Sequence, residues 1–465
     1  MIKFHFLNVG HGDATIIELP DNYLMVVDFN RSNEFDEDTA RELSDVYEIN
    51  FTELKDKKDG YYKYISKYYD IPLDDPLSYL EENIKQENIF RYVQTHPDID
   101  HLSGFKALIE NYKIVNFWDT EHKNIIKTDF INESDREDWE CYLEYRKYKK
   151  KVFYRSSKEI IAIRNLYPYK IYVFHPTKEA LKAGDLYENP EPNFFSYLIL
   201  IDYCGFKTVL GGDVTQNYWK DLWDWLDKYK SIKELFKNIS ILKASHHGRK
   251  SGRCGWEENG IYNREFLNWM DPKYVIISVG KKPENCDATE WYIKRPDKSN
   301  RNVLTTRWYG TICTSYDGSI PFNEERVILE TRYDRKDKSE HIEKLKLSFI
   351  KSEYKFKIGA KISAKSNGPF REEYKSNGRV LIKNICLKFY IKKTDIKTPY
   401  EVKWRVVNTG EEARIARDLR GKIEDGRNDK TKIEHTKYKG THYMDCFAIK
   451  DGFCIAKDKF FVNIK

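Results

Sequence analysis

Two imidazoles and two carboxylates lie within a run of six residues, at His96, Asp98, Asp100 and His101. The preceding run IFRYVQT predicts a short strand, and a tight loop that leaves a strand can point all four side chains into one small volume. Imidazole nitrogen together with carboxylate oxygen suits a divalent transition-metal ion. Because crowded carboxylates repel each other, a cation is their natural counter-charge. The run therefore predicts a metal site; the alternative is a solvated acidic turn.

Groups of the same kind follow three other predicted strands. Asp28 ends LMVVDF, Asp213 follows TVLGG, and the pair His246-His247 follows ILKAS. The two glycines before Asp213 let the backbone pass close to a ligand. Polar side chains at the ends of several strands are how an α/β scaffold builds a site. The repetition favours a shared metal site over an isolated acidic turn.

The elements that position these groups are those of a mixed α/β domain. Residues 2–29 predict three strands, residues 31–87 a mostly helical insertion, and residues 194–213 a hairpin around Cys204-Gly205. Residues 216–229 predict a helix with Trp219 and Trp223 on one face, which we interpret as core. Residues 303–318 predict a closing hairpin. We therefore expect one domain over residues 1–320, a charged linker over 321–345 and a β-rich domain over 346–465.

Composition excludes some classes of protein. Hydrophobic residues make up 40% and aromatic residues 15% of the chain, which predicts a folded protein. The net charge of +6 permits contact with nucleic acid without requiring it. We see neither a signal peptide nor an apolar run near the roughly 20 residues of a membrane span, so no membrane association is expected. Eight scattered cysteines without a CxxC pair predict a reduced, cytoplasmic protein.

In their order, the motifs NVGHGDA, VVDF, THPDIDH, LGGD and KASHHG resemble the metallo-β-lactamase superfamily, and within it the hydrolase domain of ComEC-type competence proteins. The resemblance covers about residues 1–318. It implies an α/β fold, a four-layer αββα sandwich here carrying a helical insertion and followed by the β-rich domain. The metal site is then expected at one edge of the two sheets.

The resemblance also implies two divalent metal ions and assigns their ligands. His96 and Asp98 would hold one ion, Asp100, His101 and His246 the second, and Asp213 would bridge both. His247 would touch the substrate, so Asp100 and His247 are the residues expected to take part in catalysis. Asp13 and Asp28 would support the metal loop from behind.

The chain departs from the branch at several positions. Asn8 and His11 stand where the branch has Asp and Gln, and neither is an expected metal ligand. The superfamily's third-motif His has no counterpart between His101 and Asp213, where Asn193 and Ser196 match the branch's habit of a polar residue. Asp98 in place of the commoner His favours Mn²⁺, with Zn²⁺ as the second choice.

Residues 346–465 resemble the C-terminal sensor domain called AGS-C, which occurs beside nucleotide second-messenger synthases in bacterial antiviral systems. This resemblance implies recognition of a nucleotide-like signal. Arg420 beside Gly421 could bind phosphate, His442 could add a donor, and Trp404 could stack on a base. The alternative is that Trp404 belongs to the β-core, which we favour, and that Arg420 pairs with a carboxylate.

Together these features predict a metal-dependent phosphoester hydrolase, a nuclease or a phosphodiesterase, controlled by a nucleotide-sensing domain in bacterial antiviral defence. Nucleic acid or a nucleotide second messenger is the expected substrate or ligand, and a homodimer is left open. The alternative is a fold that has lost catalysis and serves as a nucleotide-responsive binding or interaction module. Metal content and turnover separate the two.

Overall fold

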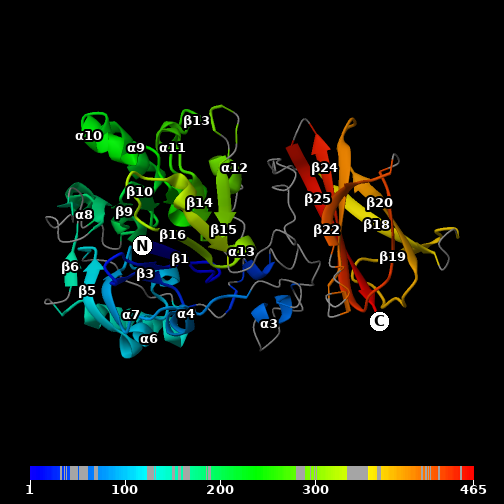
Figure 1. Cartoon of the computed structure of the whole chain (residues 1–465), viewed down its shortest axis with the longest axis horizontal. Coiled ribbons are helices and arrows are strands. Elements are labelled where there is room, and N and C mark those ends of the chain that lie inside the picture. The colour runs from blue at the N-terminus through cyan, green and yellow to red at the C-terminus, as the bar shows by residue number, and fades with distance from the viewer. Residues whose placement is uncertain are drawn as a thin grey trace. The chain divides into compact units, whose positions relative to one another are not determined.

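The computed structural model of the chain describes residues 1–31, 34–35, 37, 39–41, 51, 61–66, 72–122, 130, 132–148, 152–155, 159–160, 168–184, 186, 190–278, 288–293, 295–297, 299, 301–331, 354–363, 368–409, 412–413, 416, 418, 420–427, 430–450 and 453–465. Two compact units divide the chain. The N-terminal unit comprises Met1–Leu43 and Thr52–Tyr333, and the C-terminal unit comprises Ser44–Phe51 and Asp334–Lys465. Each is described by itself (Figure 1).

The N-terminal unit contains two large sheets. The first has the order β17-β16-β1-β2-β3-β4-β5-β6. Its strands are β1 (Ile2–Phe6), β2 (Ala14–Glu18), β3 (Leu24–Phe29), β4 (Asn88–Val93), β5 (Lys113–Asp119), β6 (Val152–Tyr154), β16 (Ile312–Tyr316) and β17 (Ile328–Thr331). The strands from β17 to β3 pair antiparallel, and those from β3 to β6 pair parallel.

The second sheet has the order β15-β14-β11-β10-β9-β8-β7. Its strands are β7 (Glu159–Ile160), β8 (Lys170–His175), β9 (Leu198–Tyr203), β10 (Phe206–Leu210), β11 (Ile241–Lys243), β14 (Tyr274–Ile277) and β15 (Asn302–Thr305). A small hairpin, β12 (Trp256–Glu258) with β13 (Ile261–Asn263), stands apart from it.

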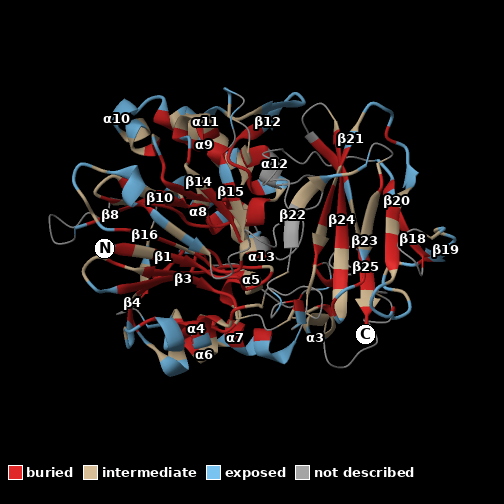
Figure 2. Ribbon diagram, turned by 45° about the vertical axis from the view of Figure 1, so that its right-hand side comes forward, coloured by how far each residue is buried: buried red, intermediate tan, exposed pale blue. Residues whose placement is uncertain are grey.

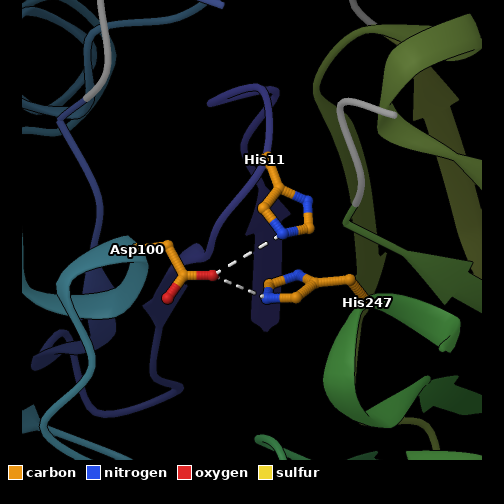
Figure 3. Close-up of side chains that lie close together, drawn as sticks. All are labelled: His11, Asp100 and His247. Carbon is orange, nitrogen blue, oxygen red and sulfur yellow. Dashed lines mark ion pairs between the residues drawn. The ribbon is translucent and has the colours of Figure 1, made fainter. Parts of the chain in front are cut away.

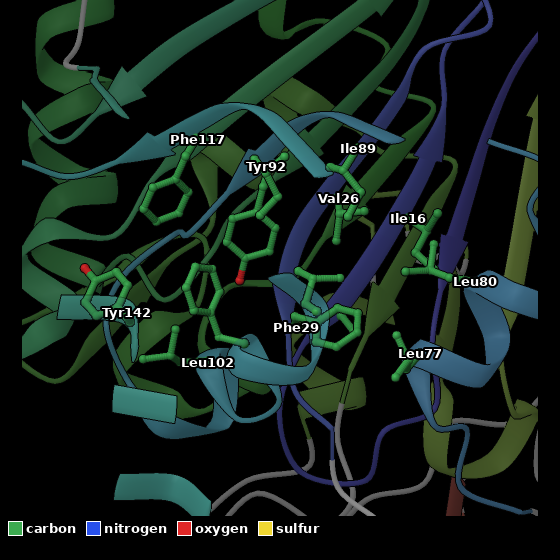
Figure 4. Close-up of a cluster of buried hydrophobic side chains, with 14 of the residues drawn as sticks. Ile16, Val26, Phe29, Leu77, Leu80, Ile89, Tyr92, Leu102, Phe117 and Tyr142 are labelled. Atoms are coloured by element: carbon green, nitrogen blue, oxygen red, sulfur yellow. The ribbon is translucent and has the colours of Figure 1, made fainter. Parts of the chain in front are cut away.

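Three apolar layers hold these sheets. Between them lie inward-facing side chains of both sheets, such as Phe4 and Phe6 from β1 and Ile199 and Ile201 from β9. The other face of the first sheet packs against α4 (Pro76–Asn83), α6 (Phe105–Asn111) and α7 (Glu133–Tyr145), as Figure 4 shows for part of this cluster. The other face of the second sheet packs against α9 (Gln216–Leu226), α11 (Glu265–Met270) and α12 (Ala288–Ile293).

Because helices cover both outer faces of two stacked sheets, the unit is a four-layer αββα sandwich, and the expected fold is confirmed. Central strands such as β3, β9 and β11 are buried on both faces, whereas the edge strand β17 is partly exposed (Figure 2). The remaining helical segments are short: α3 (Tyr61–Ile65), α5 (Ile99–Leu102), α8 (Lys178–Gly184), α10 (Lys230–Lys233), α13 (Thr306–Tyr309), and the 3-10 turns η1 (Pro192–Phe195), η2 (Glu234–Phe236), η3 (Ser245–Gly248), η4 (Lys250–Gly252) and η5 (Glu324–Arg326). No described helix is both long and apolar enough to cross a membrane.

Some sequence-based elements are confirmed and others are wrong. β9 and β10 form the predicted hairpin, and α9 buries Trp219 as expected. Residues 303–318 form no hairpin, because β15 pairs with β14 in the second sheet whereas β16 pairs with β1 in the first. β17 lies within the stretch predicted as linker but extends the first sheet through β16. Of the predicted insertion, α3 and α4 are described, and most of the rest lies outside the described residues.

The C-terminal unit consists of two four-stranded antiparallel sheets, of orders β19-β18-β20-β23 and β22-β21-β24-β25. Their strands are β18 (Phe356–Ser363), β19 (Glu372–Tyr374), β20 (Cys386–Thr394), β21 (Glu401–Val407), β22 (Arg420–Asp425), β23 (Lys432–His435), β24 (Gly440–Lys450) and β25 (Phe453–Ile464). One apolar cluster joins side chains of both sheets, with Trp404 and Phe389 among its members. The predicted β-rich character of this segment is confirmed.

Candidate metal centre

Asp28 organises the loop that follows β4. It is the penultimate residue of β3 and has a left-handed φ of 57°. Its carboxylate accepts hydrogen bonds from the backbone N–H and the hydroxyl of Thr95, both at 2.7 Å. The same carboxylate lies 2.8 Å from Nδ1 of His101. A carboxylate at Nδ1 fixes the ring so that Nε2 is the atom presented to a ligand. Asp28 thus orients His101 from behind.

Four imidazoles surround the carboxylate of Asp213, which follows β10. Nε2 of His101 lies 3.4 Å from Oδ1, and Nε2 of His96, His246 and His247 each lie 3.8 Å from Oδ2. Oδ1 of Asp213 and Nε2 of His96 are buried and have no hydrogen-bond partner among the described residues. Buried polar atoms are rarely left in this state, so the two atoms mark a position for a group that binds both. Imidazole nitrogen and carboxylate oxygen fit a divalent transition-metal ion there.

A second group lies beside the first. Oδ2 of Asp100 is 3.2 Å from Nε2 of His247 and 3.9 Å from Nε2 of His11 (Figure 3). Nδ1 of His247 is held 2.9 Å from the backbone carbonyl of Ser278, so this ring too presents Nε2. Nε2 of His247 also lies 3.3 Å from Nε2 of His101, which joins the two groups into one centre.

The pKa shifts of these side chains indicate that the centre attracts positive charge. Burial alone would lower the pKa of His101 and His247, but the carboxylates around them, Asp213 first, raise both. These imidazoliums in turn hold the pKa of Asp213 well below its usual range against its burial. Burial lowers the pKa of His246 to about 4. The carboxylates thus favour positive charge at His101 and His247, and a metal ion would supply that charge in their place.

The structure places the two histidines of the HHG triplet differently from their assigned roles. His247, expected to touch substrate, is buried beside Asp100 and His101. His246, assigned to the second ion, is partly exposed, approaches Asp213 alone among these carboxylates, and lies 3.0 Å through Nδ1 from Oγ of Ser251. Both residues have a left-handed backbone, each with φ 50°, and the resulting turn sends their side chains in different directions. The sequence order alone does not reveal this turn.

Asp98 also differs from its expected role. Its side chain accepts a hydrogen bond from the backbone N–H of Ile99 at 3.1 Å and caps the N-terminus of α5. It belongs to none of the three groups of described residues that could hold an ion, which are His96 with His101 and Asp213, His11 with Asp100 and His247, and Asp13 with Asp28 and His101. The preference for Mn²⁺, which rested on Asp98, therefore has no support from this geometry.

Of the residues expected to support the centre, Asp13, Asp28 and Ser196 lie beside it, whereas Asn193 does not. Ser196 accepts the backbone N–H of Asp213 at 2.7 Å and lies 3.5 Å from Nδ1 of His96. Gly212, with φ 46°, brings the backbone so close to Ser196 that an added Cβ would lie 2.4 Å from its hydroxyl. Asn193 lies in η1 and lines a cavity rather than the centre itself. Asp13 forms a buried ion pair with Lys243 at the end of β11.

Sequence reasoning missed three participants. His11 was not expected near the metal, yet its ring centroid lies 4.6 Å from that of His247, with the two rings tilted by 49°. Arg249 donates to Nε2 of His11 at 3.2 Å, which brings a permanent positive charge to the rim. Lys243 was read as part of a strand. A lysine at a buried strand position, three residues before the HHG triplet, was the signal that could have identified it.

The three residues proposed for nucleotide sensing, Trp404, His442 and Arg420, lie in different surroundings. Trp404 is fully buried in the core of the C-terminal unit, which fits the core interpretation and leaves no exposed ring face for a base. His442 lines a cavity of about 700 Å³, but its Nδ1 accepts from the N–H of Thr409 at 3.0 Å and its Nε2 lies 2.7 Å from the carbonyl of Tyr438. Arg420 begins β22, and its side chain lies outside the described residues.

Comparison with known proteins bears on both units. Residues 336–465 match the family model described as the Adenylyl/Guanylyl and SMODS C-terminal sensor domain. The chain is 23% identical over 239 residues to "ComE operon protein 3" of Bacillus subtilis (strain 168), a match that covers 49% of this chain and 25% of that relative. The chain thus spans only a quarter of the length of this curated relative.

Solved structures with similar folds include the diiron β-hydroxylase CmlA from Streptomyces venezuelae, with a TM-score of 0.34 at 10% identity over 65% of this chain and 52% of that one. Zn²⁺-bound PqqB from Methylobacterium extorquens gives a TM-score of 0.32 at 9% identity over 65% of this chain and 97% of that one. At these scores the fold is assigned from this chain's own two sheets and their helical layers. The chain joins an N-terminal αββα unit, whose fold is that of the metallo-β-lactamases and whose sequence is similar to the ComEC-type branch, to a C-terminal segment that matches the adenylyl/guanylyl and SMODS sensor-domain model.

Proposed function

We propose that the N-terminal unit is a divalent-metal-dependent phosphoester hydrolase, a nuclease or phosphodiesterase. The observation that carries the proposal is the convergence of four Nε2 atoms on Asp213, with the buried Nε2 of His96 and Oδ1 of Asp213 lacking a hydrogen-bond partner among the described residues. His96, His101, His247, Asp100 and Asp213 are the residues that would hold two ions. Divalent ions supply Lewis-acid stabilisation of the phosphoryl oxygens when they are bound.

The residues around the centre supply orientation and charge. Asp28 and the carbonyl of Ser278 fix the rings of His101 and His247 before any ligand arrives. Arg249 and His11 lie on the partly exposed side, where a guanidinium can bind a non-bridging phosphoryl oxygen. His246, also partly exposed, takes the role expected earlier for His247, that of contacting the substrate.

We propose that the C-terminal unit controls this activity by binding a nucleotide-like signal, in bacterial antiviral defence. The sensor-domain match supports the first part, and the cavity of about 700 Å³ between its sheets offers a site. Asn384, Asn408 and His442 are among its polar lining residues, together with Lys437. Because His442 is engaged with backbone groups, we assign it the shaping of this cavity rather than direct binding.

The test is metal content combined with turnover. Purified full-length protein should bind close to two equivalents of Mn²⁺ or Zn²⁺ and should cleave at least one member of a panel of DNA, RNA and cyclic nucleotides. Asp213→Ala should abolish cleavage, and the matched control Asp224→Ala, a change at an exposed carboxylate of α9, should leave it unchanged. A folded protein without metal and without turnover would favour the alternative, a nucleotide-responsive binding module.

A further inference from the structure

The N-terminal unit contains a cavity of about 1210 Å³ outside the metal centre. Its walls come from β8, α8, η1, α9, α10 and η2, with Ser251 of η4 at one side. This volume exceeds that of an ordinary small-molecule pocket, which is about 300–1,000 Å³. None of the residues assigned to the metal centre lines it, so it is a separate feature of the fold.

Two short connections join the cavity to the metal centre. Ser251 lines the cavity and places its hydroxyl 3.0 Å from Nδ1 of His246. His175 lines it too and bonds through Nδ1 to the carbonyl of Ser196, whose hydroxyl accepts the N–H of Asp213. One edge of the cavity, at Ser251, therefore lies within a hydrogen bond of His246, and Asp213 is reached from it through His175 and Ser196.

The cavity wall is largely aromatic. Tyr172 and Phe174 stack with ring centroids 6.4 Å apart, and Trp225 lies 4.6 Å from Tyr229 at an angle of 34° between their planes. Phe194 adds a ring that is 44% exposed. Aromatic rings of this kind bind planar ligands by stacking, and a nucleobase is such a ligand.

The acidic side chains of the cavity favour planar ligands that donate hydrogen bonds. The charged residues among its described lining are all acidic: Glu179, Glu191 and Asp221. His175 is neutral at pH 7 because burial lowers its pKa to about 4. Carboxylates repel a phosphate and accept N–H groups. Guanine offers two adjacent donors, N1–H and the N2 amino group, to one carboxylate, whereas adenine places an acceptor beside its amino group.

We propose that this cavity binds the guanine base of the substrate and directs the adjoining phosphoester to the metal centre. The inference rests on the proposed phosphoester hydrolase and names its substrate class as a guanine-containing nucleotide. Asp221 is the acceptor we assign to the base, because it stands on α9 one turn from Trp225 and from Tyr218. Trp225 supplies the stacking surface.

The experiment measures binding without turnover. Full-length protein in chelator is titrated calorimetrically with GMP, AMP, CMP and ribose 5-phosphate. We expect GMP to bind at least tenfold more tightly than each of the other three. Asp221→Asn should weaken GMP about tenfold and leave ribose 5-phosphate unchanged, while the matched control Asp224→Asn, on the same helix but outside the cavity, should change neither.

Trp225→Ala should weaken GMP, AMP and CMP together, with an unchanged melting temperature as the check on folding. Equal binding of GMP and AMP would overturn the guanine assignment, and equal binding of GMP and ribose 5-phosphate would overturn the base site itself. An unaltered GMP affinity in both variants would also overturn it. GMP binding that persists in a protein without hydrolase activity would refute the proposed function and leave the base site standing.

Discussion

The buried ion pair between Lys243 and Asp13 gives the sharpest test of how the metal loop is held. Both side chains are nearly inaccessible, at 5% and 4% exposure. Lys243 ends β11, which lies between β10 and β14 in the second sheet, and Asp13 stands in the loop between β1 and β2 of the first. The pair therefore links the two sheets directly behind the centre.

We expect Lys243→Met to lower the free energy of unfolding by about 3–5 kcal/mol, because it leaves the carboxylate of Asp13 buried without its counter-charge. Oδ1 of Asp13 has no hydrogen-bond partner among the described residues, so little else compensates that charge. Asp13→Leu should cost a similar amount by stranding the ammonium. The double variant should be less destabilised than the two single changes added together, with a coupling energy of about 3 kcal/mol.

Tryptophan fluorescence in a urea titration follows the unfolding of the N-terminal unit. Of the ten tryptophans, all except Trp404 precede Asp334 in the sequence, so they dominate the signal. Chelator is kept in the buffer so that metal affinity does not add to stability. Lys220→Met is the matched control, because its pair with Asp224 is exposed, and it should cost less than about 1 kcal/mol. Additive single changes, within about 0.5 kcal/mol, would refute the reasoning.

Three further predictions concern the centre, the cavity and the C-terminal core. Asp28→Asn should weaken Mn²⁺ binding by about 10–100-fold in calorimetry, because His101 loses its oriented partner; an unchanged affinity would contradict this. Burial lowers the pKa of His175 to about 4 in the folded protein, whereas the unfolded chain has the ordinary pKa of 6.5. Between these pH values the unfolded state binds a proton at His175 and the folded state does not, so stability is lost as the pH falls from 6.5 to 4. The free energy of unfolding lost between pH 7 and pH 4 should therefore be smaller in His175→Gln than in the wild type by roughly 3 kcal/mol. An equal loss in the variant and the wild type would contradict burial of His175 in its neutral form. Trp404→Ala should destabilise the C-terminal unit by about 3–5 kcal/mol in calorimetry and spare the N-terminal transition, since the ring is fully buried.

The fold of the N-terminal unit was readable because its signals are local. Alternating or continuous apolar runs identify β1, β3, β9 and β10, and the turn at Cys204-Gly205 identifies a hairpin. The error at residues 303–318 arose because sheet membership is not local. Two adjacent strands look like a hairpin in sequence, yet α13 between β15 and β16 carries the chain from one sheet to the other.

The site was predictable in its residue types and less so in its roles. His96, Asp100, His101 and Asp213 lie together because each follows a strand of the sandwich, which a sequence can show. The side-chain directions of His246 and His247 depend on two backbone angles that no residue pattern specifies. His11 and Lys243 belong to the surroundings through contacts across 236 and 230 residues, which spacing alone cannot reveal.

The left-handed backbone at His246 and His247 has a consequence for how this protein can change. Each such residue other than glycine is strained by roughly 1–2 kcal/mol. The backbone of this loop therefore lowers the stability of the fold. His246→Gly would remove the backbone strain at that position, and it would also remove an imidazole from the centre. Selection for heat resistance alone would discard this loop early. Durability and chemistry thus make opposite demands on the same two residues.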